Sequence, residues 1–315
     1  MASEPEVHTA CLAGYLEQLQ GGAQLESSGV FTLSGSKSEE KLRQFRLPDK
    51  RLYVLNAVAA TVALGASSAE IYCDADDFIL TAHVHSLPKN ALSDLVPRIL
   101  QDEAAPGLRE LGLAYFGAQA LEPAYIRLET PEQRLEWPGD RLTAATGPNV
   151  LRLHVHERVT ARTAQKFIAK ITGQTRLDSE EDALKRHCNL VPIPITLNGQ
   201  PLARPIVVGQ TDFSRLLLPP GLMARHPLAS LKMTSSKGEW PALLARGGRL
   251  APYLILVVNG VNFRLSTEAL GSNDVRAIVY ADHLRKDLSQ ASLVQNQNFQ
   301  RVIQSLRHAS SERGR

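Results

Sequence analysis

Two His-x-His pairs are the residues of this sequence whose types and spacing best suit metal chemistry. They are His83 with His85 and His154 with His156. Residues two apart in a strand lie on the same face, so each pair offers two imidazole nitrogens to one ion, and imidazole is a zinc ligand. Histidines on exposed or half-buried strands are nevertheless commoner than metal ligands. We therefore expect no metal site at either pair.

An acidic run, Asp74, Asp76 and Asp77, is the next candidate for ion binding. Aspartate is also a normal turn residue, because its side chain bonds to nearby backbone amides. The run therefore predicts a hairpin turn without a bound cation. The sequence also contains no G-x-S-x-G, P-loop or H-E-x-x-H motif, so the common signatures of hydrolases, nucleotide-binding loops and zinc proteases are missing.

The three cysteines, Cys11, Cys73 and Cys188, are far apart and form no CxxC pair. An odd number of isolated cysteines argues against a disulfide framework and fits a reducing compartment. Neither Cys73 nor Cys188 has an evident base in register, so we expect neither to act as a nucleophile. The first ten residues show no basic segment followed by an apolar core, which predicts that there is no signal peptide. Together these features predict a cytoplasmic protein.

Length and charge limit the remaining classes. A chain of 315 residues predicts two domains. The net charge of +3 is too small to predict nucleic-acid or membrane binding, which needs a dense basic face. The longest strongly apolar run, residues 253–258, is far shorter than the ~20 residues of a membrane helix. We therefore expect no membrane association, and nucleic acid is an unfavoured partner.

The elements that would position any site begin with a buried helix over residues 53–64, which is apolar on every face and ends at Gly65. A hairpin follows over residues 69–85, around the acidic turn. Periodicity then predicts helices over 91–102, 108–121 and 160–171, and strands over 125–129, 150–156, 191–197, 253–258, 261–265 and 277–280. A last helix places Phe299, Val302, Ile303 and Leu306 on one stripe. Residues 216–241 are expected to be weakly structured.

This order of elements resembles the GHKL, or Bergerat-fold, ATPases. The similarity rests on Leu64-Gly-Ala-Ser before a strand, Leu87-Pro-Lys-Asn-Ala-Leu after the hairpin, and Thr146-Gly-Pro-Asn-Val before the strand over 150–156. Residues 278–289 resemble the middle domain of the ninety-kilodalton heat-shock chaperone of bacteria. The resemblance implies an α+β protein: a Bergerat-type α/β sandwich over residues 1–200 and a smaller, middle-domain-like α/β domain over 201–315. It also implies antiparallel strands with the two histidine pairs near opposite ends.

The resemblance further implies a nucleotide site whose chemical groups are replaced. Aligned on Gly65, the helix position of the catalytic carboxylate falls at Ala59 and that of the metal-binding amide at Ala60. Aligned on Pro88, the adenine-reading aspartate falls at Ala82. The arginine expected at the γ-phosphate falls at Gln290, which carries no charge. The former pocket would be lined by six residues: Asn56, Ala63, Ala82, His83, Gly112 and Gly147.

We therefore expect a non-catalytic member of the group, which binds one or more proteins as a chaperone-like or regulatory module and needs no cofactor. The alternative is a diverged chaperone-type or repair-type ATPase that binds ATP and Mg²⁺ through relocated residues. Glu40, Asp49 and Glu110 are the candidates for a displaced catalytic acid. A third possibility is a nucleic-acid binder that uses the basic C-terminal helix.

Overall fold

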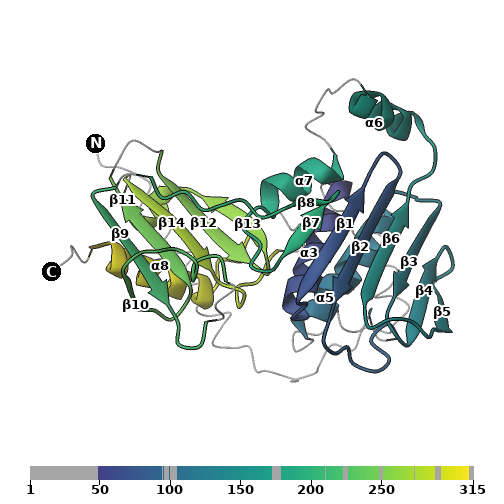
Figure 1. The fold of residues 1–315 in the computed structure, drawn as a ribbon, viewed down its shortest axis with the longest axis horizontal. Coiled ribbons are helices and arrows are strands. Elements are labelled where there is room, and N and C mark those ends of the chain that lie inside the picture. Colours follow the sequence, from purple (N-terminus) through teal and green to yellow (C-terminus); the bar gives the residue numbers. More distant parts are fainter. Residues whose placement is uncertain are drawn as a thin grey trace, which may run out of the picture.

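The fold contains two mixed β-sheets with helices packed on them (Figure 1). This computed structural model describes residues 49–93, 95, 99, 105–171, 179–209, 211–222, 226–247, 251–272, 274–287 and 292–311. The predicted α+β class is confirmed, because both sheets combine parallel and antiparallel pairs and carry helices. The predicted division of the chain at residue 200 stays a prediction.

The first sheet has eight strands among the described residues, in the order β5-β4-β3-β6-β2-β1-β7-β8. Neighbouring strands pair antiparallel except β1 with β7, which run parallel. The strands are β1 (Ser68–Cys73), β2 (Asp77–His83), β3 (Tyr125–Glu129), β4 (Gln133–Trp137), β5 (Arg141–Ala144), β6 (Leu151–His156), β7 (Ile195–Leu197) and β8 (Gln200–Pro201).

Helices α3 (Tyr53–Ala63) and α5 (Pro106–Gln119) pack against each other on one face of this sheet (Figure 1). Nine consecutive residues of α3, Tyr53 to Thr61, are buried, as the apolar sequence on all sides predicts. Gly65 ends the helix with φ +69°, a left-handed conformation that glycine adopts without strain. The predicted buried helix and its glycine stop are confirmed.

Among the described residues, no helix covers the opposite face of the first sheet (Figure 1). In β6 the buried residues Leu151, Leu153 and Val155 alternate with less buried side chains, among them His154 and His156. Alternate side chains of a strand point to opposite faces, so the apolar set lies under α3 and α5 while the polar set faces away from them. Charged and polar side chains of the first sheet thus gather on one surface.

Two further helices lie at one end of the first sheet, α6 (Ala161–Ile171) and α7 (Glu180–His187). Helix α6 stands away from the strands, at the upper right of Figure 1. The Nζ of Lys166 on α6 lies 2.6 Å from Glu157 and 2.8 Å from Glu180, so one lysine connects α6 to the end of β6 and to α7.

In the part of the chain that the structure describes, the second sheet has six strands, in the order β10-β9-β11-β14-β12-β13. Helix α8 (Gln297–Ser311) packs on it through the stripe predicted from the sequence, all four residues of which are buried. The strands are β9 (Phe213–Leu218), β10 (Ser235–Lys237), β11 (Ala242–Arg246), β12 (Tyr253–Val258), β13 (Val261–Leu265) and β14 (Val275–Tyr280).

Three differences from the sequence prediction concern short elements. Residues 216–241 are not simply irregular, because the second half of β9 and all of β10 lie within them. Strands β4 and β5 were not predicted, since each is only four or five residues long and half polar. The strand predicted over 191–197 is confined to β7, after which Asn198 and Gly199 form the expected tight turn to β8 with positive φ.

The two sheets share a core. The hydroxyl of Tyr280, in β14, donates to the carbonyl of Leu190 over 2.9 Å, and the side-chain amide of Asn262, in β13, donates to that of Asn189 over 2.6 Å. One continuous cluster of buried apolar side chains includes residues of both sheets. No helix among the described residues is long and apolar enough to cross a membrane.

Candidate functional site

The alanines at the presumed nucleotide positions lie inside the packed core. Ala59 and Ala60 on α3 and Ala82 on β2 are each 0% exposed, and Ala63 is partly buried near the end of the helix. A side chain with no exposed surface contacts neither solvent nor a ligand that arrives from solvent. These methyl groups fill the space between α3 and its neighbours as ordinary core residues.

Asn56, the remaining polar candidate on α3, belongs to a buried polar group with Glu110 and Lys286. The Nζ of Lys286 lies 2.6 Å from Oε2 of Glu110 and donates to Oδ1 of Asn56 over 3.4 Å. Side-chain exposure is 2% for Lys286 and 5% for Glu110. The Nδ2 of Asn56 has no hydrogen-bond partner among the described residues. We call these three residues the buried triad.

The buried triad joins elements that are far apart in the sequence. Asn56 comes from α3 and Glu110 from α5, whereas Lys286 follows β14 of the second sheet. The contact between Glu110 and Lys286 could not be predicted from a local sequence pattern, because the two residues are 176 positions apart. From the sequence, Asn56 was predicted only as a residue of the former pocket and Glu110 only as a candidate catalytic acid.

The other predicted pocket residues lie on separate parts of the fold. Gly112 is inside α5, where an added Cβ would lie 2.7 Å from Cδ1 of Ile99, so its small size serves helix packing. Gly147 is exposed in the loop before β6, and His83 is exposed at the end of β2. Gln290 lies outside the described residues.

Two of the three candidates for a displaced catalytic acid form ion pairs with basic side chains. Asp49 caps the short 3₁₀ helix over Lys50–Leu52 and forms an ion pair with Arg51. Glu110 is held by Lys286 in the buried triad. A general base must reach the proton that it removes, directly or through one water. Glu40 lies outside the described residues.

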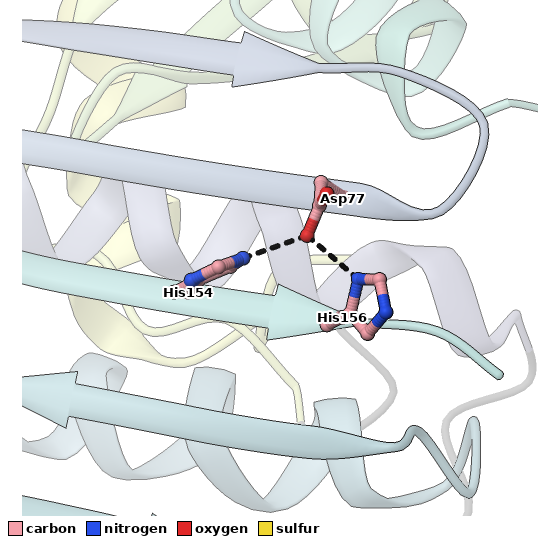
Figure 2. A group of neighbouring side chains, drawn as sticks. All are labelled: Asp77, His154 and His156. Carbon is pink, nitrogen blue, oxygen red and sulfur yellow. Dashed lines mark hydrogen bonds and ion pairs between the residues drawn. The ribbon is translucent and has the colours of Figure 1, made fainter.

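The open face of the first sheet brings Asp77, His154 and His156 together (Figure 2). Oδ1 of Asp77 lies 2.7 Å from Nε2 of His154 and 2.9 Å from Nδ1 of His156. The three side chains are 26%, 14% and 31% exposed. We call these residues the Asp77–histidine cluster. All three are candidates from the sequence, but there they belong to two separate groups, the acidic run and a histidine pair.

The other histidine pair is exposed, and the acidic run forms the predicted hairpin turn. His83 and His85 are exposed, and antiparallel pairing of β2 with β6 places His83 at the opposite end from His156. Oδ1 of Asp74 accepts the backbone amides of Asp76 and Asp77 at 3.2 and 2.9 Å, as in an aspartate turn.

The two described cysteines are free thiols, both buried. Burial raises the pKa of the Cys188 thiol to about 12 and raises the pKa of the Cys73 thiol further above its ordinary value. The thiolate is the reactive form of cysteine, so neither residue is suited to nucleophilic chemistry near neutral pH.

Comparisons with known proteins give a structural likeness alone. No protein-family model matches the sequence, and no curated protein matches it. A solved structure described as the crystal structure of the N terminal domain of a DNA repair protein is similar over 86% of this chain and 96% of its own, with a TM-score of 0.44 and 9% identity. The class that the fold itself defines is a mixed α+β protein with two sheets.

Proposed function

We propose that this protein is a non-catalytic relative of the GHKL ATPases and acts as a cytoplasmic protein-interaction module of a chaperone-like or regulatory kind. The observation that carries the proposal is the buried triad beside the alanines of α3. Where a nucleotide site of that family needs a base and a metal ligand, Ala59 and Ala60 supply neither. The two free thiols agree with a reducing compartment.

The two charges of the buried triad neutralise each other. Glu110 and Lys286 form a close ion pair with almost no exposed surface. A catalytic base must reach the proton of the attacking water, whereas the Glu110 carboxylate has almost no exposed surface and is held by the Lys286 ammonium group. The alternative, an ATPase whose catalytic acid has moved to Glu110, is therefore disfavoured.

Helix α6 supports the interaction role. Phe167 and Ile168 are each 58% exposed although both are large and apolar. Exposed aromatic and aliphatic side chains close together on one element are typical of protein contact surfaces. The ion pairs of Lys166 hold the polar side of α6 against the body of the protein, which leaves these two side chains outside.

Nucleotide binding is the decisive measurement. Calorimetry and thermal-shift assays with ATP, ADP and Mg²⁺ should show no micromolar binding and no hydrolysis above the buffer rate. The matched variants are Glu40→Gln, Asp49→Asn and Glu110→Gln, each of which removes one candidate acid. Micromolar binding by the wild-type chain, or hydrolysis that one of these changes abolishes, would establish the ATPase alternative instead.

A gel-shift assay addresses the nucleic-acid alternative. Binding of nucleic acid through a basic helix weakens steeply with salt, because counterions are released. We expect no salt-sensitive shift with single- or double-stranded DNA or with RNA. A shift that disappears in the Arg301→Gln, Arg307→Gln variant would instead assign that role to α8.

A further inference from the structure

The Asp77–histidine cluster lies on the sheet face opposite to α3 and α5, away from the buried triad. Its geometry follows from the pairing of β2 with β6. Asp77 stands directly opposite His156 in the antiparallel register, and His154 stands opposite Ile79, one diagonal step away. Residues with this relation share a face, so the pleat of the sheet aims all three side chains at one point (Figure 2).

Three ligand atoms of the right kind converge there. They are Oδ1 of Asp77, Nε2 of His154 and Nδ1 of His156, and each lies within 4.8 Å of the others. Two imidazole nitrogens and one carboxylate oxygen are a donor set used by zinc and by other divalent transition metals. We propose that Asp77, His154 and His156 bind a divalent transition-metal ion, with Zn²⁺ as the expected occupant.

The distances suit an ion after a small adjustment. Tetrahedral bonds of ~2.0 Å to a shared ion place ligand atoms ~3.3 Å apart. The carboxylate-to-nitrogen distances of 2.7 and 2.9 Å would then lengthen by ~0.5 Å. Partial exposure of all three side chains leaves room for that movement, and it leaves the remaining coordination positions open to water or to a small anionic ligand.

Tyr125 orients both imidazole rings. Its ring stacks on that of His156, with centroids 5.2 Å apart and an angle of 25°, and meets the ring of His154 edge to face at 4.9 Å. Fixed orientation of the ligands by their neighbours is a general feature of metal sites. Asp74 and Asp76, at the adjacent turn, add negative charge beside the ligands and favour a cation.

A simple pair of hydrogen bonds to Asp77 is the competing explanation. The chain offers a matched control for it, because the exposed pair His83 and His85, at the end of β2 and just beyond it, has the same spacing. Untagged, chelator-treated full-length protein is titrated calorimetrically with Zn²⁺. The wild-type chain should bind one ion, the His154→Gln, His156→Gln variant should bind it about 100-fold more weakly, and the His83→Gln, His85→Gln variant should be unchanged.

Three results would overturn the proposal: no Zn²⁺ binding by the wild-type chain, equal affinity of the two double variants, or loss of binding in Asp74→Asn, Asp76→Asn without loss in the His154→Gln, His156→Gln variant. The last result would assign the ion to the acidic turn. Thermal unfolding without metal checks that each variant is folded.

Histidine NMR of the wild-type chain keeps the proposal testable if a variant fails to fold. Zn²⁺ should shift the imidazole signals of His154 and His156 and leave those of His83 and His85 in place. The assignments come from the folded His83→Gln, His85→Gln control. Signals of His154 and His156 that do not respond to Zn²⁺ would contradict the site.

Discussion

At the scale of single residues, the ion pair between Glu110 and Lys286 has the largest expected effect on stability. Both side chains are almost fully buried, so neither charge has water to replace its partner. Removal of one member of such a pair leaves an uncompensated buried charge, whereas removal of both is often tolerated. The buried triad therefore makes a quantitative prediction about single and double variants.

The single variant Lys286→Met should lower the free energy of unfolding by about 3–5 kcal/mol, because it leaves the charge of Glu110 buried alone. The double variant Lys286→Met, Glu110→Leu should regain much of that loss, since it removes both charges and keeps the volume apolar. Urea unfolding followed by circular dichroism measures the free energy of unfolding of the wild-type chain, the single variant and the double variant.

An exposed ion pair is the control. Lys185 and Glu181 stand one turn apart on α7 and are 48% and 31% exposed. Lys185→Met should change stability by less than about 1 kcal/mol, as for most surface pairs. A similar small change in Lys286→Met would mean that the triad is hydrated and contributes little.

His226 predicts an acid-sensitive contribution to stability. Burial lowers the pKa of its imidazole to about 4, and its Nδ1 accepts the backbone amide of Leu228 over 3.2 Å. The unfolded chain then binds a proton more readily than the folded chain between about pH 6.5 and pH 4. The stabilisation is fully present above about pH 6.5 and is lost as the pH falls toward 4.

Unfolding by urea at a series of pH values measures this contribution. His226→Gln should show a shallower loss of stability than the wild-type chain between pH 6.5 and pH 4, and the two slopes should agree above pH 7. Identical slopes over the acidic range would show that His226 is protonated as easily in the folded chain as in the unfolded chain.

At the scale of elements, close packing of α3 and α5 depends on glycine. A Cβ added to Gly107, in the first turn of α5, would lie 2.6 Å from Cγ of Leu64 and 3.0 Å from its backbone nitrogen. Contacts below 3.0 Å force one group to move, and backbone moves less easily than the end of a side chain. The first turn of α5 therefore approaches the C-terminal end of α3 only because residue 107 lacks a side chain.

Gly107→Ala should lower the free energy of unfolding by about 1–3 kcal/mol, which is the usual cost of overpacking. Gly147→Ala is the matched control, because an added Cβ there has no neighbour within 4 Å. The control should stay within about 0.5 kcal/mol of the wild-type chain. Equal effects of the two changes in thermal or urea unfolding would show that α3 and α5 can separate freely.

Elements with a strong local pattern could be predicted from the sequence. The apolar run of α3, the hairpin of β1 and β2, and the Asn259-Gly260 turn between β12 and β13 each carry their signal within a few residues. Strands β4, β5 and β10 carry little local signal, because they are only three to five residues long and polar at half or more of their positions. The predicted helix over residues 91–102 lies largely outside the described residues.

The candidate sites were less predictable for the same physical reason. His154 and His156 were recognisable as a pair, but Asp77 joins them only through the register of β2 with β6. Glu110 was considered only as a catalytic acid, because nothing near it in the sequence announces Lys286. Sites built across strands or between sheets depend on tertiary contacts that a single sequence does not reveal.

At the scale of the whole molecule, the shared core predicts cooperative unfolding. The two tryptophans are convenient probes, because Trp137 lies in β4 of the first sheet and Trp240 lies next to β11 of the second. The variants Trp137→Phe and Trp240→Phe each leave one reporter. The two variants should give the same urea midpoint once each is corrected for the effect of its substitution on stability. Coincident transitions of different probes are the test of two-state unfolding.

Fluorescence and circular dichroism of both variants provide the comparison. If the Trp240 signal changes well before the Trp137 signal, the sheets unfold as separate units and the contacts of Tyr280 with Leu190 are weak. Circular dichroism follows both sheets at once and would then show two steps.

Lys286 also determines where the chain can be divided. A fragment that ends at residue 200 contains Glu110 and Asn56 but not the lysine whose Nζ lies 2.6 Å from that carboxylate. Such a fragment would need either to keep the Glu110 carboxylate buried without a charge partner or to open α5 to water. Replacement of Glu110 by leucine would remove that need, so an engineered first half carrying this change should be better folded than the native fragment.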